Sequence, residues 1–296
     1  MKILIIGASG MLGRALSKHL GTVHEVYGIG RSKFETNEIK YITLDLLEKN
    51  KIELYLSLNQ FDLIINLAAI VNHQFCNNHE DECYALNAII NNRILLSVYP
   101  QTKYLFVSSD AVFGDSDIER FETSPVNPIS VYGKTKLKAE QIIQQISSNY
   151  IILRTTIVGF SPKKTSLTDW IINNAQSNKN LSLFDDVYFN PISIFDLCLE
   201  IEYIIENFEK TSNQILHVNG SEKITKYQFG ELLVKKLQIP TTNISKSSLR
   251  NFKLKGDRVN NQFLDVEHYQ KTTSRPLPNL SKTVNSLIKN YDFDKI

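Results

Sequence analysis

The first strand and turn of the chain read KILIIGASGMLG at residues 2–13. The apolar residues after Lys2 predict a buried strand, and MLGRALSKHL at 11–20 has the period of a helix. Between them, Gly7, Gly10 and Gly13 form G-x-x-G-x-x-G, one residue longer than G-x-G-x-x-G. The first glycine permits a tight turn, the second lets backbone approach a pyrophosphate, and the third lets the helix pack closely. The stretch predicts a dinucleotide-binding turn; a glycine-rich turn without a ligand is the alternative.

Short apolar runs alternate with helical patterns over the first 160 residues. Strands are expected at 2–7, 23–30, 41–46, 61–69, 102–109 and 150–159. The intervening helical patterns are clearest at 80–98 and 132–147. Continuous apolar runs are typical of strands buried on both faces, and their alternation with helices predicts a parallel sheet. The expected fold class is α/β, a doubly wound parallel sheet of the Rossmann type with a smaller C-terminal lobe.

This rhythm changes after Gly159. Helical patterns appear at 167–177, 194–208, 225–237 and 279–290, with a short strand at 214–220 and polar irregular sequence elsewhere. We therefore expect a dinucleotide-binding domain at 1–160, to which residues 190–220 return. Residues 161–189 and 221–296 are expected to form a substrate-binding lobe.

The composition is that of an ordinary soluble globular protein. Of 296 residues, 42% are hydrophobic and 22% are charged, and the formal net charge is +2. The lysines are spread along the chain, so no nucleic-acid partner is expected. No apolar stretch approaches the roughly 18 residues that span a bilayer, so we expect no membrane partner and a cytoplasmic location.

Cysteine and histidine spacings give no metal motif. The three cysteines, Cys76, Cys83 and Cys198, include no Cys-x-x-Cys, which favours reduced thiols over a redox pair between Cys76 and Cys83. The six histidines include no His-x-x-x-His on a helix, so no metal is expected. His73 follows the fourth strand and could line a pocket, although packed or surface histidines are more common.

The end of the second strand bears on the choice of cofactor. An acidic residue at this place holds the ribose 2′-OH of NAD, whereas an arginine receives the 2′-phosphate of NADP. The strand ends GIGRS, which places Arg31 and Ser32 there and no carboxylate. The planar fork of an arginine suits a phosphate, so the sequence favours NADPH; a solvated loop arginine is the alternative.

A Tyr-x-x-x-Lys spacing occurs three times. Tyr99/Lys103 straddles Pro100, which ends a helix, and Tyr291/Lys295 lies at the C-terminus, where helices fray. Tyr132/Lys136 lies in SVYGKTKLKAE, a pattern that continues as a helix, so these two side chains share one face.

This pair suits acid/base chemistry. A free tyrosine has a pKa of about 10, and a neighbouring ammonium is expected to lower it and make the phenol a better proton donor. Ser108 and Ser109 follow the fifth strand at its carboxyl end, where open α/β sheets bind ligands. A serine there supplies a further donor to the same substrate oxygen; an ordinary loop serine is the alternative.

At these residues the chain resembles the extended short-chain dehydrogenase/reductases, and more closely the dTDP-4-dehydrorhamnose reductase family. The resemblance covers nearly the whole chain. Its matching segments are the glycine turn, NLAA (66–69), Asn87 in YALN, Ser108-Ser109-Asp110 followed by VF, YGKTK (132–136), ILRT (152–155), FNPIS (189–193) and HVNGSEKITKYQF (217–229). The resemblance implies that Tyr132 is the proton donor, Lys136 its activator and Ser109 the third catalytic hydroxyl.

The resemblance also implies a reductase that uses NADPH (NADP) on a nucleotide-diphosphate 4-keto-6-deoxy sugar. The expected cofactor contacts are Gly7, Ser9, Gly10, Met11, Leu12, Gly13, Arg31, Ser32, Asp45, Leu46, Leu67, Ala68, Ala69, Asn87, Tyr132 and Lys136. The expected substrate contacts are Val71, Ser109, Asp110, Ala111, Val112, Tyr132, Asn190 and Arg258.

Some positions depart from the family pattern, and one concerns assembly. Ala111 stands where the family often has an aromatic residue, and Ile157 where it often has Trp, so the identity of the sugar stays open. Helices 80–98 and 132–147 resemble the pair through which extended members dimerise. We therefore expect a homodimer, with Tyr84, Ile90 and Ile94 on the contact face.

Other functions remain possible on this fold. Nucleotide-sugar epimerases and dehydratases keep tightly bound NAD, and Arg31 argues against them. A non-catalytic NADP-binding regulatory subunit is the other alternative, and the intact Ser109, Tyr132 and Lys136 argue against it.

Overall fold

The computed structural model describes residues 1–115, 118–239, 243–251 and 259–291. They form two compact units. Unit 1 comprises Met1–Gly114, Pro125–Arg154 and Glu202–Leu216, and unit 2 comprises Asp115–Ser124, Thr155–Ile201 and His217–Ile296. The segment that returns to unit 1 is thus shorter than 190–220, and residues 115–124 belong to unit 2.

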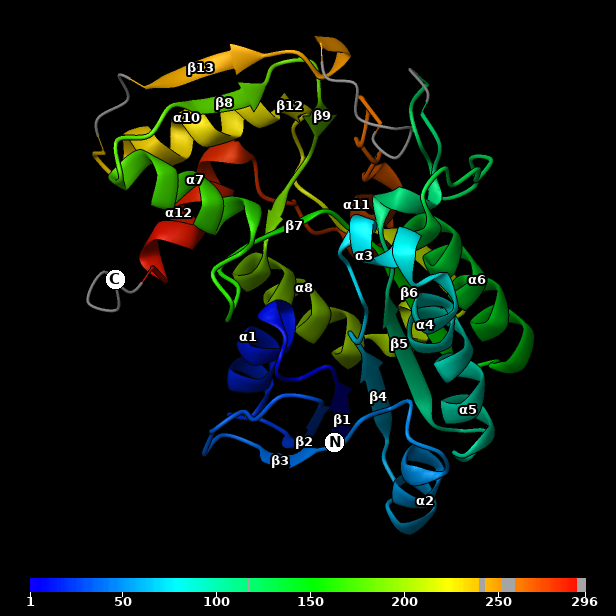
Figure 1. The fold of residues 1–296 in the computed structure, drawn as a ribbon. Coiled ribbons are helices and arrows are strands. Elements are labelled where there is room, and N and C mark those ends of the chain that lie inside the picture. The colour runs from blue at the N-terminus through cyan, green and yellow to red at the C-terminus, as the bar shows by residue number, and fades with distance from the viewer. Residues whose placement is uncertain (116–117, 240–242, 252–258, 292–296) are drawn as a thin grey trace. The chain divides into compact units, whose positions relative to one another are not determined.

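Unit 1 is built on a seven-stranded sheet with the order β11-β6-β5-β4-β1-β2-β3 (Figure 1). The strands are β1 (Lys2–Ile6), β2 (Glu25–Gly30), β3 (Lys40–Thr43), β4 (Leu63–Asn66), β5 (Lys103–Val107), β6 (Tyr150–Arg154) and β11 (Gln214–His217). Every neighbouring pair from β6 to β3 is parallel, so Ile3 lies between Val26 and Leu63. The order runs outward from β1 in both directions, which confirms the doubly wound prediction.

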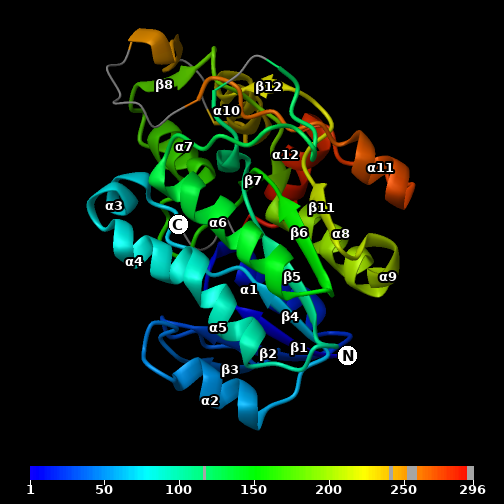
Figure 2. The same ribbon diagram turned by 90° about the vertical axis from the view of Figure 1, so that its right-hand side faces the viewer.

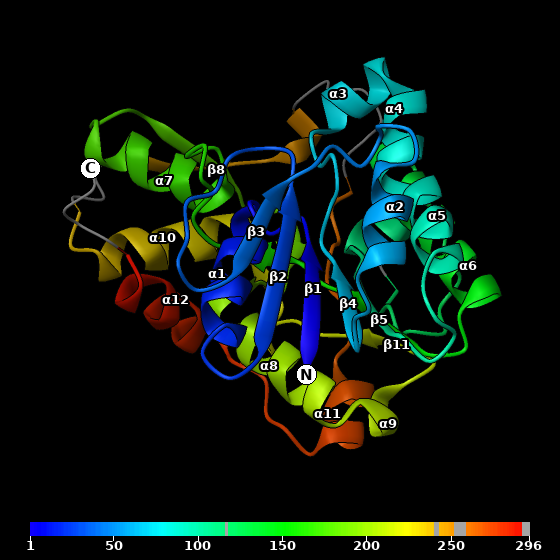
Figure 3. The same cartoon turned by 90° about the horizontal axis from the view of Figure 1, so that it is seen from below.

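Helices cover both faces of this sheet (Figure 3). One face carries α1 (Met11–Leu20) and the end of α8 (Ile194–Glu206), where His19 Nε2 and Glu202 Oε2 are 2.8 Å apart. The other face carries α2 (Lys51–Leu58), α4 (Glu80–Tyr84), α5 (Ile90–Leu96) and α6 (Val131–Ile146). Figure 2 shows α4, α5 and α6 side by side. Two shorter helices complete the unit, α3 (His73–Asn78) and α9 (Phe208–Thr211).

Apolar side chains fill the space between the sheet and the second set of helices. The cluster includes Leu4 and Phe106 of the sheet and Ile143 of α6. Ile90 and Ile94 belong to it as well and are 1% and 0% exposed. The prediction that they lie on a dimer contact face is therefore wrong, because they cover the sheet of their own unit.

The helix expected at 80–98 is not regular. α4 is followed by a π-helical turn, η1 (Ala85–Ile89), and only then by α5. Short π-helical turns inside helices are frequent at functional sites. Here the turn contains Asn87, whose contacts are described below.

Unit 2 combines short two-stranded sheets with a layer of helices. Its elements are β7 (Ile157–Val158), α7 (Leu167–Gln176), β8 (Leu181–Phe184), β9 (Tyr188–Phe189), β10 (Ile192–Ser193), the start of α8, β12 (Ile224–Thr225), α10 (Lys226–Lys236), β13 (Ile244–Ser247), η3 (Leu249–Asn251), α11 (Glu267–Thr273) and α12 (Leu280–Lys289). β10 pairs with β7 and β13 with β8 in parallel, and β12 pairs with β9 antiparallel. Ile171, Leu183, Phe229 and Leu287 are part of its apolar core.

Capping residues in the sequence fix where two of these helices begin. Ser166 and Asp169 form a capping box at α7, in which each side chain bonds the other's backbone N–H. Thr225 and Gln228 do the same at α10. Such boxes satisfy N–H groups that the first helical turn leaves unpaired.

Several predicted boundaries need correction. The strand expected at 150–159 ends at Arg154, because Thr155 Oγ1 then donates to Val218 O and Thr156 N to Asn219 Oδ1. The strand expected at 41–46 ends at Thr43. β13 and α11 form where irregular structure is predicted. In the part of the chain that is described, no helix combines the length and apolar character needed to cross a bilayer.

Candidate active site

The glycine turn after β1 fits an approaching phosphate group at one position. Gly7 has φ +88°, and a Cβ there would lie 2.8 Å from Ala68 N. A Cβ on Gly13 would lie 2.2 Å from Gly7 O, so α1 packs directly on the turn. Gly10 is exposed, and an added Cβ would meet only Gly7 O, at 3.2 Å. Gly7 and Gly13 therefore shape the turn, and Gly10 keeps its outer side open.

Two arginines lie near the glycine turn in the fold, Arg14 on α1 and Arg31 directly after β2. Arg31 is exposed, and the following residue is held because Tyr41 Oη donates to Ser32 O (2.5 Å). Arg14 of α1 donates from Nε to Ser9 O (3.0 Å) and lies 4.5 Å from the Phe34 ring centroid. No ion pair with a carboxylate within the described ranges engages either arginine. Sequence reasoning missed Arg14, whose signal was its place just after Gly13.

The phenol of Tyr132 meets the hydroxyl of Ser109. Ser130 is the N-cap of α6 and its Oγ accepts from Gly133 N (3.0 Å), so Tyr132 lies in the first turn. Burial raises the pKa of Tyr132 above its usual value, Asp110 acts in the same direction, and a hydrogen bond with Ser109 opposes them. The prediction of a lowered pKa is therefore wrong for this structure, because burial outweighs the influences that favour the phenolate.

The ammonium of Lys136 is directed to β5. Its Nζ donates to Val107 O (2.7 Å) and lies 3.9 Å from the Phe106 ring centroid. The side chain is 2% exposed, and burial lowers the pKa of Lys136 to about 7, while the Glu140 carboxylate acts to raise it. Lys136 is thus a buried cation whose charge depends on its surroundings near neutral pH.

The two serines after β5 have different partners. Ser109 Oγ donates to Asp110 Oδ1 (2.9 Å) and accepts from Ala111 N (3.2 Å), in addition to its bond with Tyr132. Ser108 Oγ donates instead to Glu140 Oε1 (2.5 Å). Of the two serines named from the sequence, Ser109 is therefore the one that meets the phenol.

Glu140 and Arg154 form a buried ion pair that sequence reasoning missed. Arg154 Nε donates to Glu140 Oε1 (3.0 Å), and its Nη2 donates to Oε2 (2.7 Å). The side chains are 1% and 3% exposed. The available signal was a carboxylate four residues after Lys136, on the same helical face, and an arginine ending an apolar strand.

Asn87 holds the loop after β4 against α6. Its Nδ2 donates to Ile70 O (3.0 Å) and Thr135 Oγ1 (3.0 Å), and its Oδ1 accepts from Ile70 N (2.7 Å). The residue is 0% exposed. Both amide donors are thus used inside the unit, and the cofactor contact of Asn87 stays a prediction.

His73, at the start of α3, and Val71, two residues before it, lie at the surface. His73 is exposed, and its ring centroid is 5.3 Å from that of Tyr132, with the rings tilted by 48°. Val71 is 64% exposed, as a ligand contact requires. The structure thus brings His73 to the candidate site, where sequence reasoning favoured a packed or surface role.

The side chains of three other predicted contact residues are buried. Leu46 packs in the apolar core at 6% exposure, and Val112 is 0% exposed. Asn190 is 0% exposed, and its Nδ2 donates to Gly220 O and Leu264 O, both at 2.8 Å. These residues have structural roles. Arg258 lies outside the described residues.

The remaining predicted cofactor contacts follow the ends of β1 to β4. They are Ser9, Met11, Leu12, Ser32, Asp45, Leu67, Ala68 and Ala69. Leu12 is 5% exposed, and Asp45 Oδ1 accepts from Leu47 N (3.0 Å). These contacts stay predictions.

The other tyrosine–lysine pairs differ from Tyr132/Lys136. Tyr99 follows α5 by three residues, is 51% exposed, and its Oη accepts from Gln60 Nε2 (2.9 Å). Tyr291 follows α12, and Lys295 lies outside the described residues. Tyr99 and Lys103 share no helix, as predicted.

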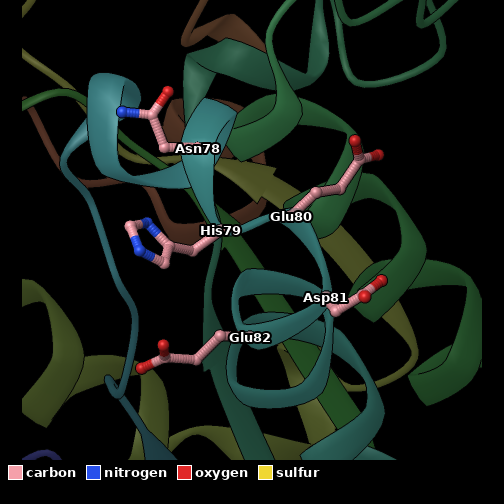
Figure 4. Close-up of a pocket in the computed structure, with 5 residues that line it drawn as sticks. All are labelled: Asn78, His79, Glu80, Asp81 and Glu82. Atoms are coloured by element: carbon pink, nitrogen blue, oxygen red, sulfur yellow. The ribbon is translucent and has the colours of Figure 1, made fainter.

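A hollow between α3 and α4 carries acidic side chains. It is lined by Asn78, His79, Glu80, Asp81 and Glu82. Figure 4 shows the carboxylate of Glu82 pointing away from those of Glu80 and Asp81, so they do not converge on one point. Within the described ranges, no cluster of three or more His, Cys, Asp or Glu side chains could hold a metal ion.

All three cysteines are free thiols and are buried. Cys83 Sγ nevertheless donates to Cys76 Sγ (2.7 Å). Burial raises the pKa of the Cys76 thiol to about 12, so this pair has little thiolate near neutral pH.

Known proteins resemble the chain over most of its length. The family model described as RmlD substrate binding domain matches residues 1–293. The dTDP-4-dehydrorhamnose reductase of Aggregatibacter actinomycetemcomitans is 24% identical over 77% of this chain and 76% of its own length. Methionine adenosyltransferase 2 subunit beta of Bos taurus is 24% identical over 82% of this chain and 74% of its own length.

Solved structures share the fold. The structure of dTDP-4-dehydrorhamnose reductase from Bacillus anthracis in complex with NADP has a TM-score of 0.81 at 19% identity, covering 98% of this chain and 99% of that chain. UDP-glucuronic acid 4-epimerase from Bacillus cereus, in complex with UDP-glucuronic acid and NAD, has a TM-score of 0.82 at 18% identity, covering 98% of both chains. At these identities the likeness concerns the fold alone. Because the family model matches nearly every residue, the chain belongs to the RmlD substrate-binding-domain family of extended short-chain dehydrogenase/reductases.

Proposed function

We propose that this protein is an NADPH-dependent reductase of a nucleotide-linked 4-keto-6-deoxy sugar. The observation that carries the proposal is the close packing of α6 on the turn after β5, where Gly133 lies against Ala111 O. This packing places Tyr132 beside Ser109, with Lys136 one turn further along the same helix. These groups lie at the carboxyl end of β5, the edge at which open α/β sheets bind ligands. The family and its dTDP-4-dehydrorhamnose reductase relative support the class of substrate.

The two hydroxyls suit reduction of a carbonyl group. Oη of Tyr132 can donate to the substrate oxygen, and Oγ of Ser109 can do the same once its single proton turns from Asp110 to that oxygen. Both hydroxyls then stabilise the negative charge that develops on the oxygen. Because the pKa of Tyr132 is raised, the phenol is protonated at neutral pH and has a proton to transfer. The Asp110 carboxylate accepts from Ser109 and so orients its hydroxyl.

The residues present fit a nicotinamide dinucleotide. Gly10 leaves the turn open for the pyrophosphate at the N-terminus of α1, and Arg31 with Arg14 presents positive charge where a 2′-phosphate would bind. When bound, the cofactor supplies the hydride. The chain's own contribution is to bind it, orient it and protonate the oxygen.

One turnover assay tests the proposal. The protein is incubated with NADPH and a panel of nucleotide-linked 4-keto-6-deoxy sugars, while NADPH loss is followed optically and products by mass spectrometry. We expect stoichiometric NADPH consumption and a product two hydrogens heavier. A rearranged or dehydrated sugar without net NADPH consumption identifies an epimerase or dehydratase and overturns the proposal.

A second function has one observation in its favour. A relative at 24% identity is named as a subunit of methionine adenosyltransferase, so a non-catalytic NADP-binding subunit is the competing proposal. Tight NADPH binding without turnover of any sugar in the panel supports that role. The hydrogen-bonded Tyr132 and Ser109 favour the reductase.

A further inference from the structure

The carboxylate of Glu140 joins three elements around the candidate acid/base pair. It lies one turn after Lys136 on α6. It accepts from Ser108 Oγ, which follows β5, and from two nitrogens of Arg154, which ends β6. One buried group thus connects α6 to the end of β6 and to the serine turn that follows β5.

The charges in this interior are uneven. Lys136 and Arg154 are cations and Glu140 is the anion, and each is at most 3% exposed. An isolated buried charge is strongly unfavourable, so the carboxylate matters to both cations and not only to the one it contacts. The Glu140 carboxylate raises the pKa of Lys136, whereas burial lowers it.

Other titratable groups packed around the site act on the phenol. Asp110 after β5 and Cys76 on α3 raise the pKa of Tyr132, and the ring of His73 lies beside it. Neither Asp110 nor Cys76 is among the influences on Lys136. Glu140 is the carboxylate that acts on the lysine.

We propose that Glu140, oriented by Arg154, is a positioning residue that keeps the Lys136 ammonium charged and holds the Ser108–Ser109 turn against α6. The catalytic consequence rests on the proposed function, since a charged Lys136 matters there for binding the cofactor and assisting Tyr132. The ionisation of Lys136 does not rest on it and is measurable without turnover.

The test is an NMR titration of Lys136 in the full-length protein. Lysine labelled with ¹³C at Cε reports the charge of each side chain, and the signal of Lys136 is assigned by its loss in Lys136→Arg. The variants are Glu140→Gln, Arg154→Met and the double variant Glu140→Gln/Arg154→Met. Because one unpaired buried charge can prevent folding, the double variant, which leaves neither charge, keeps the test valid.

The three variants have different expected outcomes. Glu140→Gln removes the anion and lowers the titration midpoint of Lys136 by on the order of one to two pH units. Arg154→Met removes the cation that partly neutralises the carboxylate, so the midpoint of Lys136 rises. The double variant lowers the midpoint of Lys136 below that of the parent by less than Glu140→Gln does, because the Arg154 cation is removed together with the anion. If Glu140 and Arg154 only stabilised the fold, the Lys136 midpoints of the three variants would not follow this order.

A matched control comes from another ion pair of unit 1. Arg93 binds Glu53 through Nε (2.5 Å) and Nη2 (2.9 Å), and neither is among the influences on Lys136. The double variant Glu53→Gln/Arg93→Met should leave the Lys136 midpoint unchanged. An unchanged midpoint in folded Glu140→Gln/Arg154→Met overturns the inference.

Turnover separates this inference from the proposed function. If sugar reduction is present, the alkaline limb of the kcat profile should move with the Lys136 midpoint in each variant. If no sugar is reduced but the midpoints shift as expected, the proposed function fails and the positioning role stands. If the sugar is reduced but the Lys136 midpoints do not shift, the proposed function stands and the positioning role of Glu140 fails.

Discussion

Tyr132 holds its proton more tightly than a free tyrosine does. Burial and the Asp110 carboxylate both disfavour the phenolate, and Ser109 only partly offsets them. A phenol with a raised pKa is protonated at neutral pH, so it can act as a proton donor and not as a base. The residue therefore suits the reducing direction, in which an oxygen must be protonated.

Replacing this phenol tests its role directly. We expect Tyr132→Phe to lower kcat by about 10²–10⁴-fold, because a general acid is lost, while the affinities for cofactor and substrate are kept. Steady-state kinetics and cofactor titration measure the two effects. Tyr99→Phe and Tyr291→Phe are the controls and should turn over like the parent. A Tyr132→Phe protein with the parent's kcat refutes the assignment.

The arginines after β2 and in α1 set the expected cofactor preference. If Arg31 binds the 2′-phosphate, Arg31→Ala should weaken NADPH binding by about 1.5–3 kcal/mol, as for a charge-assisted hydrogen bond, and leave NADH binding unchanged. Arg14→Ala should act in the same direction. Lys33→Ala, an exposed change on the same loop, is the control. Calorimetry that finds equal NADPH and NADH affinities in the parent contradicts this prediction.

Two glycines of the turn between β1 and α1 are expected to have different roles, Gly13 in the stability of the fold and Gly10 in cofactor binding. Gly13→Ala places a Cβ 2.2 Å from Gly7 O, so the helix must move and the protein should lose stability. Gly10→Ala meets nothing closer than 3.2 Å, so it should fold normally but bind NADPH weakly. Thermal unfolding and cofactor titration distinguish the two. Normal NADPH binding by Gly10→Ala speaks against a pyrophosphate at this turn.

α6 brings the catalytic candidates together through its spacing. Tyr132, Lys136 and Glu140 follow one another at intervals of four residues and so lie on one face. The start of α6 packs on the turn after β5, where a Cβ on Gly133 would lie 2.1 Å from Ala111 O. The glycine next to Tyr132 therefore permits the close approach that brings Ser109 to the phenol.

For the whole molecule, Lys136 links stability to pH. Its pKa of about 7 in the folded protein lies below the value of about 10.4 in an unfolded chain. Between these values the unfolded chain binds more protons, so the free energy of unfolding rises with pH from this group. From pH 7 to 9 the parent should gain roughly 2 kcal/mol relative to Lys136→Met.

Denaturant unfolding at several pH values measures this difference. Lys138→Met changes an exposed lysine of the same helix and is the control, with the pH dependence of the parent. A parent and a Lys136→Met protein with parallel pH profiles would show that the lysine is charged in the folded state throughout this range.

The assembly of the whole molecule stays a prediction. Ile90 and Ile94 are core residues, but Ile89 and Leu96 of the same segment are 43% and 70% exposed. We expect a homodimer whose contact uses such exposed side chains. Light scattering at high protein concentration checks it, and a monomer there removes the prediction.

The features that could be predicted from the sequence are those that depend on short separations along the chain. The period of apolar residues predicts the sheet and its helices, and the glycine spacing predicts the turn after β1. The four-residue interval selects Tyr132 and Lys136. Each of these is a local geometric relation, fixed by the repeat of a strand or a helix.

Only the tertiary structure decided which distant groups meet. Ser108 and Glu140 are 32 residues apart and Asn87 and Thr135 are 48 apart, so no local pattern assigns these partners. The same holds for the raised pKa of Tyr132 and the lowered pKa of Lys136, because burial comes from chain segments that the sheet and helices bring around them. Local geometry selects the reactive side chains, and packing sets their charge and their partners.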